Sequence, residues 1–60
     1  SEFPWTYSDS ETCLILEGKV IVTTDHEDVT IKAGDFVVFP KGLSCRWNVL
    51  QPIRKHYSFG

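Results

Sequence analysis

The chain has 60 residues, which is enough for one small domain. Eight acidic and six basic residues give a net charge of −2, which argues against nucleic-acid or anionic-membrane partners because both usually require clustered positive side chains. Hydrophobic residues make up 42% of the chain and aromatic residues 13%, so a folded rather than a disordered chain is expected.

The cellular setting is only weakly indicated. No apolar run reaches the roughly 18 residues of a membrane-spanning helix, so we expect a soluble protein with no membrane partner. Two cysteines, Cys13 and Cys45, are too few for a disulfide scaffold. They favour a reducing compartment, either the cytoplasm or an organelle.

The first half of the chain reads as β-strands separated by turns. Residues 11–24 hold two runs of β-forming residues, and Glu17-Gly18 between them predicts a hairpin. Residues 28–42 repeat this pattern, with an Ala-Gly-Asp turn in the middle and a Pro-Lys-Gly turn at the end. His26 lies in the polar tip between these segments and is expected to be exposed.

Two more β-rich runs, residues 44–50 and 53–59, are separated by Gln51-Pro52. The only basic run, residues 54–56, is predicted to be a solvated strand face. With no helical periodicity, these segments predict an all-β fold of six or seven short strands in an antiparallel sandwich or barrel.

Residues 11–16 are predicted to have two largely apolar faces. Alternate side chains of a strand point to the same side, so one face carries Glu11, Cys13 and Ile15, and the other carries Thr12, Leu14 and Leu16. One layer of this size cannot cover both faces. We therefore expect either another stretch of chain or another subunit to pack there, and we predict a homodimer.

The spacing of residues 34–49 resembles the second signature of the cupin family, G-x5-P-x-G-x2-H-x3-N. Gly34, Pro40 and Gly42 occupy its first three anchors. Cys45 stands at the position of the metal-binding histidine, and Val49 at that of the asparagine.

Glu11 and Gly18 match the E-x6-G end of the first cupin signature, and Trp5 and Tyr7 stand where its H-x-H pair would lie. The resemblance covers roughly residues 5–59. It is closest to small single-domain cupins of the ureidoglycine-aminohydrolase and ethanolamine-utilisation type, and it implies a jelly-roll β-barrel. Residues 1–60 are then expected to be one cupin domain that lacks its amino-terminal strand and is part of a longer chain.

The resemblance also implies a metal site of three imidazoles and one carboxylate, which suits manganese, iron, nickel or zinc. Of those ligands the chain retains only Glu11, with Cys45 as a replacement for one histidine. We therefore expect neither a metal nor another cofactor.

If cupin geometry holds, seven side chains line the cavity wall: Trp5, Tyr7, Glu11, Cys13, Cys45, Trp47 and Val49. All of them except Val49 form the predicted small-molecule site. The aromatic rings suit a small, flat or partly cationic ligand, which Glu11 would orient. The competing interpretation is that these side chains simply fill a small core, with both cysteines as buried free thiols.

Three functions stay open at this point. The first is a metal-free barrel that binds a small molecule. The second is an enzyme in which Glu11 and Cys45 act on the amide or ureido metabolite that the resemblance implies. The third is a structural, oligomer-forming unit with a filled cavity.

Overall fold

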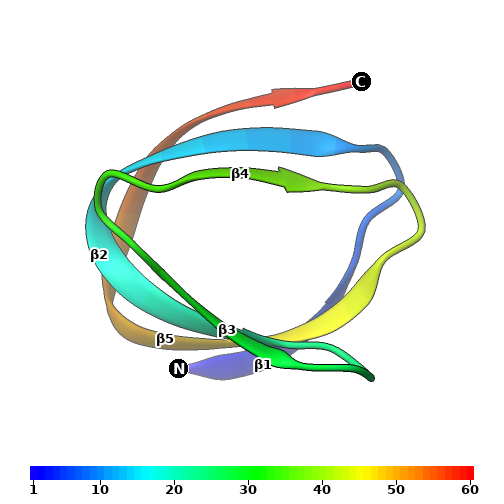
Figure 1. Ribbon diagram of the computed structural model, residues 1–60, viewed down its shortest axis with the longest axis horizontal. Helices are drawn as coiled ribbons and strands as arrows, with labels where there is room; N and C mark the ends of the chain where they lie inside the picture. The colour runs from blue at the N-terminus through cyan, green and yellow to red at the C-terminus, as the bar shows by residue number, and fades with distance from the viewer.

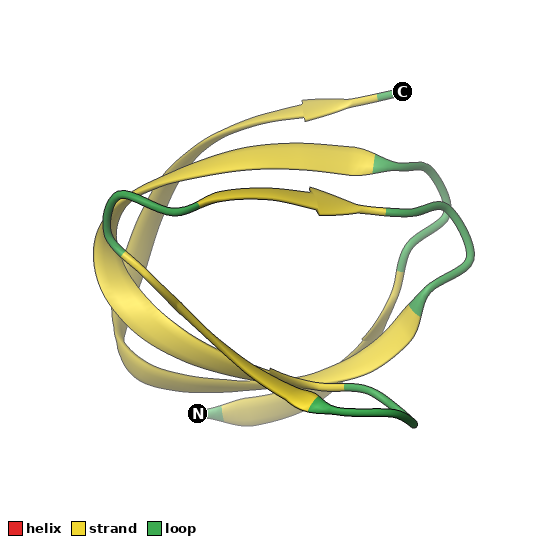
Figure 2. Ribbon diagram, in the orientation of Figure 1, coloured by secondary structure: helices red, strands yellow, loops and turns green.

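The computed structural model describes residues 1–60 as five strands and no helix (Figures 1 and 2). The strands are β1 (Glu2–Thr6), β2 (Glu11–Thr23), β3 (Asp28–Lys32), β4 (Phe36–Phe39) and β5 (Ser44–Phe59). The predicted all-β antiparallel class is confirmed, since every strand pairing is antiparallel. The chain contains no helix of the length and apolarity needed to cross a membrane.

The two long strands, β2 and β5, pair with each other and curve to form two layers that enclose the core (Figure 1). In one layer, the first part of β2 lies between β4 and the last part of β5. In the other layer, the second part of β2 pairs with β3, and the first part of β5 pairs with β1. Both long strands therefore contribute residues to both layers.

Two predicted breaks are bends within continuous strands, so the six β-rich runs form only four strands, β2 to β5. With β1, which precedes those runs, the count is five instead of six or seven. Glu17-Gly18 does not form a hairpin, and Gln51-Pro52 does not end a strand. The β2–β5 register shifts between Ile15 and Val20, so the irregularity bends the pair without ending it. Gly18 sits at the bend with φ of +96°, and a Cβ there would overlap the carbonyl oxygen of Pro52. Only glycine accommodates both constraints.

The predicted alternation of residues 11–16 is confirmed. Glu11, Cys13 and Ile15 are buried, whereas Leu14 is exposed and Thr12 and Leu16 are half-buried. The inward side chains form a hydrophobic core of nine buried residues: Tyr7, Cys13, Ile15, Val20, Val22, Ile31, Phe39, Cys45 and Trp47.

The outward face of the β2–β4 layer carries exposed apolar side chains from neighbouring strands, namely Leu14, Phe36 and Val38. This surface is where a second copy would pack, and the homodimer stays a prediction.

At the end opposite the bends, two loops hold the layers together. The Tyr7 N–H donates to the Leu43 carbonyl at 2.9 Å, and the Gly42 N–H donates to the Tyr7 carbonyl at 2.8 Å. Gly42 belongs to the predicted Pro-Lys-Gly turn and has φ of +86°. These bonds fix the backbone of Tyr7 at the edge of the core, with its side chain buried.

The bend predicts a specific sensitivity at Gly18. Gly18→Ala would force the backbone away from Pro52 and place alanine in a left-handed conformation, so we expect it to lower the free energy of unfolding by more than about 3 kcal/mol. Gly34→Ala is the matched control, because Gly34 has φ of +94° but nothing lies within 4 Å of a Cβ there. It should cost only about 1 kcal/mol of backbone strain. Urea unfolding of both variants measures this, and equal losses would contradict the close approach.

Candidate functional site

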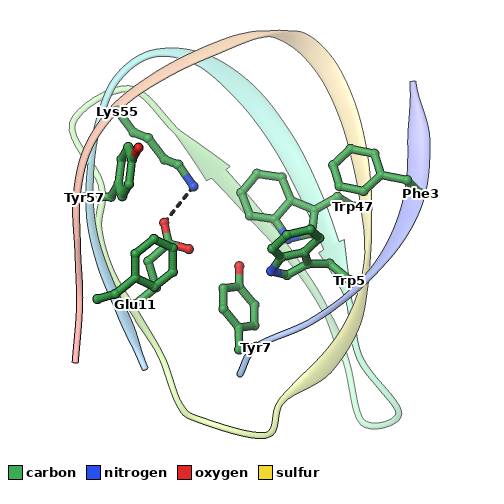
Figure 3. Close-up of a pocket in the computed structure, with 8 residues that line it drawn as sticks. Phe3, Trp5, Tyr7, Glu11, Trp47, Lys55 and Tyr57 are labelled. Carbon is green, nitrogen blue, oxygen red and sulfur yellow. Dashed lines mark hydrogen bonds and ion pairs between the residues drawn. The ribbon is translucent and has the colours of Figure 1, made fainter. Parts of the chain in front are cut away.

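A pocket of about 370 Å³ is lined by residues of β1, the start of β2 and both parts of β5 (Figure 3). Six of its eight lining residues are hydrophobic. The full set is Phe3, Trp5, Tyr7, Glu11, Trp47, Lys55, Tyr57 and Phe59. The pocket is thus an aromatic enclosure with two charged side chains.

Those two charged side chains form an ion pair within the pocket. The Lys55 Nζ lies 2.7 Å from Glu11 Oε2, and the side chains are 24% and 3% exposed. The two residues come from β5 and β2, which are neighbours in the same layer. A carboxylate as buried as that of Glu11 requires a cation or several donors close by, and Lys55 supplies the cation.

The Lys55 ammonium also lies over two aromatic rings. Its Nζ is 5.2 Å from the centroid of the Trp47 ring and 5.4 Å from that of the Tyr57 ring. Both distances are within the range of cation–π attraction. One carboxylate and two rings therefore hold the ammonium in place (Figure 3).

A second donor reaches the same oxygen of Glu11. The Cys13 thiol donates to Oε2 at 2.8 Å from a fully buried position. Burial, together with this hydrogen bond, raises the pKa of Cys13 to about 12. The thiol is therefore protonated at neutral pH and acts as a donor, not as a nucleophile.

Tyr7 contributes a neutral hydroxyl group to the pocket. Burial and the negative charge of Glu11 raise the pKa of Tyr7 well above its usual range. The ring stacks on Phe39 at 4.8 Å between centroids, and the hydroxyl points toward the pocket interior (Figure 3). Nearby, the buried Nε1 of Trp47 has no hydrogen-bond partner.

The structure brings four of the predicted site residues, Trp5, Tyr7, Glu11 and Trp47, into the pocket wall. The two cysteines are buried free thiols that belong to the core cluster and are not part of the pocket lining. Burial raises the pKa of Cys45 as well. Val49 is half-buried and packs against the same cluster.

The other four lining residues, Phe3, Lys55, Tyr57 and Phe59, were not predicted. Lys55 belongs to the basic run that was interpreted as a solvated face, and that interpretation is wrong for this residue. Arg54 and His56 are exposed, but Lys55 between them is half-buried and points inward. The alternation of Lys55, Tyr57 and Phe59 is the signal that places the three side chains on one face.

Comparison with known proteins identifies the family. The model of the EutQ-like cupin domain matches residues 1–57. The chain belongs to the EutQ-like cupin domain family. The fold match is also close, since a DUF861 family protein from Thermotoga maritima is 59% identical, with a TM-score of 0.96. That match covers 100% of this chain and 69% of the other.

Two further matches carry the name EutQ and come from Salmonella typhimurium. A putative ethanolamine utilization protein Q from Salmonella typhimurium has a TM-score of 0.86 and 34% identity, over 98% of this chain and 48% of that protein. The acetate kinase EutQ of Salmonella typhimurium is 36% identical over 55 residues, which is 92% of this chain. The chain spans 24% of the length of that relative.

The metal centre that the cupin family implies does not fit the residues present. Oε2 of Glu11 already accepts hydrogen bonds from an ammonium and a thiol, which leaves a positive group where a cation would bind. The indole of Trp5 has no lone pair for a metal. No group of three or more His, Cys, Asp or Glu side chains lies together in the chain. That the domain uses no cofactor stays a prediction.

The ion pair predicts that Lys55 contributes strongly to stability. Lys55→Met leaves the buried carboxylate of Glu11 without its cation and should cost about 3 kcal/mol of unfolding free energy. Adding Glu11→Gln to Lys55→Met should recover part of the loss, because the unpaired charge disappears.

The matched control is Arg54→Met, which removes the neighbouring cation from an exposed pair with Glu17 at 4.0 Å. It should change the unfolding free energy by less than about 0.5 kcal/mol. Urea unfolding at pH 7 provides all these values. Similar losses for Lys55→Met and Arg54→Met would show that Lys55 is not tied to a buried charge.

The Cys13 thiol predicts a loss of stability in alkaline solution. It loses its proton at its ordinary pKa of 9.0 in the unfolded chain, but only near pH 12 in the folded one. Between these values the unfolded chain binds fewer protons, so stability falls by about 1.4 kcal/mol per pH unit as pH rises. Below pH 9 this contribution is fully present.

The variant Cys13→Ala should lose stability less steeply between pH 9 and pH 11 than the parent does, while retaining the effect of Tyr7. Urea unfolding at a series of pH values measures both slopes. Parallel curves for the two proteins would contradict the protonated buried thiol.

Proposed function

We propose that this domain binds a small molecule with a flat apolar body in its aromatic pocket. The observation that supports the proposal is the Glu11–Lys55 ion pair, which supplies a fixed polar anchor among aromatic rings. Sites for small molecules commonly combine mostly apolar walls with a few precisely placed polar groups, in volumes of about 300 to 1,000 Å³.

The exposed aromatic side chains at the pocket favour binding over a filled core. Trp5 is 48% exposed, Tyr57 60% and Phe59 55%. A core residue would not leave this much apolar surface in water, whereas the wall of a binding site does. The core-filling role suits the two cysteines, which are buried away from the pocket lining.

The chemistry of the thiols argues against the alternative in which Cys45 is a nucleophile. The raised pKa of Cys45 keeps the thiol protonated at neutral pH, and the thiolate is the reactive form. We also do not extend the acetate kinase activity named for the Salmonella relative to this domain. Phosphoryl transfer requires several positive groups around the phosphates, and Lys55 is the only cationic side chain of the pocket.

Binding can be tested by titrating a panel of small aromatic compounds against the protein and following tryptophan fluorescence. We expect saturable binding, with Trp5→Ala weakening the affinity of the best compound about tenfold, because an exposed ring of the wall is lost. The matched control is Phe36→Ala, which removes a 67% exposed ring from the outer face of β4. The proposal fails if no compound saturates, or if both variants bind as the parent does.

A further inference from the structure

We propose that the polar group of the ligand is planar and uncharged and carries a hydrogen-bond acceptor next to a donor. Primary carboxamides, lactams and the edges of nucleobases have this character. The inference rests on the proposed function, and it specifies the class of ligand that the pocket selects.

The first argument is charge. Glu11 and Lys55 neutralise each other at 2.7 Å, and no other charged side chain lines the pocket. A carboxylate ligand placed at the pair would approach Glu11, and a cationic ligand would approach Lys55. Either like-charge contact is unfavourable at this pair, because the residue Glu11 is only 2% exposed and water screens its charge weakly. An uncharged ligand avoids both contacts.

The second argument is the set of unused hydrogen-bonding groups. Lys55 has three N–H donors and uses one on Glu11. Glu11 accepts both of its hydrogen bonds on Oε2, so its other oxygen, Oε1, accepts none from the chain although the residue is only 2% exposed. Figure 3 shows this second oxygen directed toward the pocket interior. Because Oε1 is directed toward the pocket and accepts nothing from the chain, a donor of the ligand can bind it.

The third argument is the proximity of these groups. The free donors of Lys55 and the free oxygen of Glu11 belong to one ion pair, so they can form hydrogen bonds with neighbouring atoms of one ligand. A carboxamide presents its oxygen and its N–H group on a single carbon and can satisfy both at once. The Tyr7 hydroxyl, which is kept neutral and points toward the pocket interior, is a further donor for the ligand oxygen.

Lys55 then takes over the electrostatic role that a metal ion has in other cupins. It balances the carboxylate of Glu11 and offers positive charge to a ligand oxygen. The aromatic walls supply the remaining contact, since Trp5 and Tyr57 present exposed rings on which a flat ligand can stack.

The test uses three ligands of nearly equal shape: benzamide, benzoate and benzamidinium. Titrations at pH 7, followed by backbone amide NMR shifts, give the three dissociation constants. We expect benzamide to bind at least tenfold more tightly than either ion, with the largest shifts at Glu11, Lys55 and Trp5.

A charge switch sharpens this test. Glu11→Gln leaves Lys55 as an uncompensated cation, so the preference should change from benzamide to benzoate. Glu17→Gln is the matched control, since it changes an exposed glutamate of the same strand and should retain the preference for benzamide. The amide spectrum of each variant confirms that it is folded.

Tightest binding of benzoate or benzamidinium to the parent protein would overturn the proposed ligand class and leave the pocket function intact. Absence of binding by all three would overturn the ligand class as well. If the wider aromatic panel also fails to bind, the proposed function itself falls.

Discussion

The buried carboxylate of Glu11 is the constraint on which the site depends. A glutamate that is 2% exposed must be neutralised nearby, and the chain does this with Lys55, at 2.7 Å, and with the Cys13 thiol, at 2.8 Å. The lysine is in turn held over Trp47 and Tyr57. The ion pair, the Cys13 thiol and the two rings therefore form one connected group. A change to any member of this group alters the surroundings of the others.

The bends in the two long strands bring Trp47 and Lys55 together in the pocket. Trp47 lies in the first part of β5 and Lys55 in the last part, which belong to different layers (Figure 1). The bend at Gly18 and Pro52 folds one layer over the other, so the ring of Trp47 reaches the ammonium of Lys55. The backbone geometry at one glycine thus contributes to the electrostatics of the pocket.

Much of this arrangement could be predicted from the sequence, because side chains in strands alternate strictly. Alternation predicted that Glu11, Cys13 and Ile15 share one face, and the cupin spacing predicted that Tyr7 and Trp47 lie near Glu11. The structure shows that this shared face is the buried one. The hairpin predicted at Glu17-Gly18 is wrong, because the sequence does not distinguish the glycine of a bulge from the glycine of a turn.

Lys55 escaped prediction for a different reason. Its partner is 44 positions away, and the contact depends on the β2–β5 register, which local patterns do not contain. Its neighbours Arg54 and His56 are exposed, and the three basic residues taken together predicted a solvent-exposed strand face. The alternation with Tyr57 and Phe59 was the better guide to its orientation.

The central claim is that the Lys55 ammonium rests in a cage formed by Glu11, Trp47 and Tyr57. The lysine Nζ–H correlation spectrum of the ¹⁵N-labelled protein tests it most directly, with the Lys55 signal assigned through Lys55→Arg. Shielding by the two rings and the ion pair with Glu11 should give Lys55 a persistent signal shifted upfield of those of Lys19, Lys32 and Lys41. A Lys55 signal that exchanges rapidly and coincides with those three would contradict the cage.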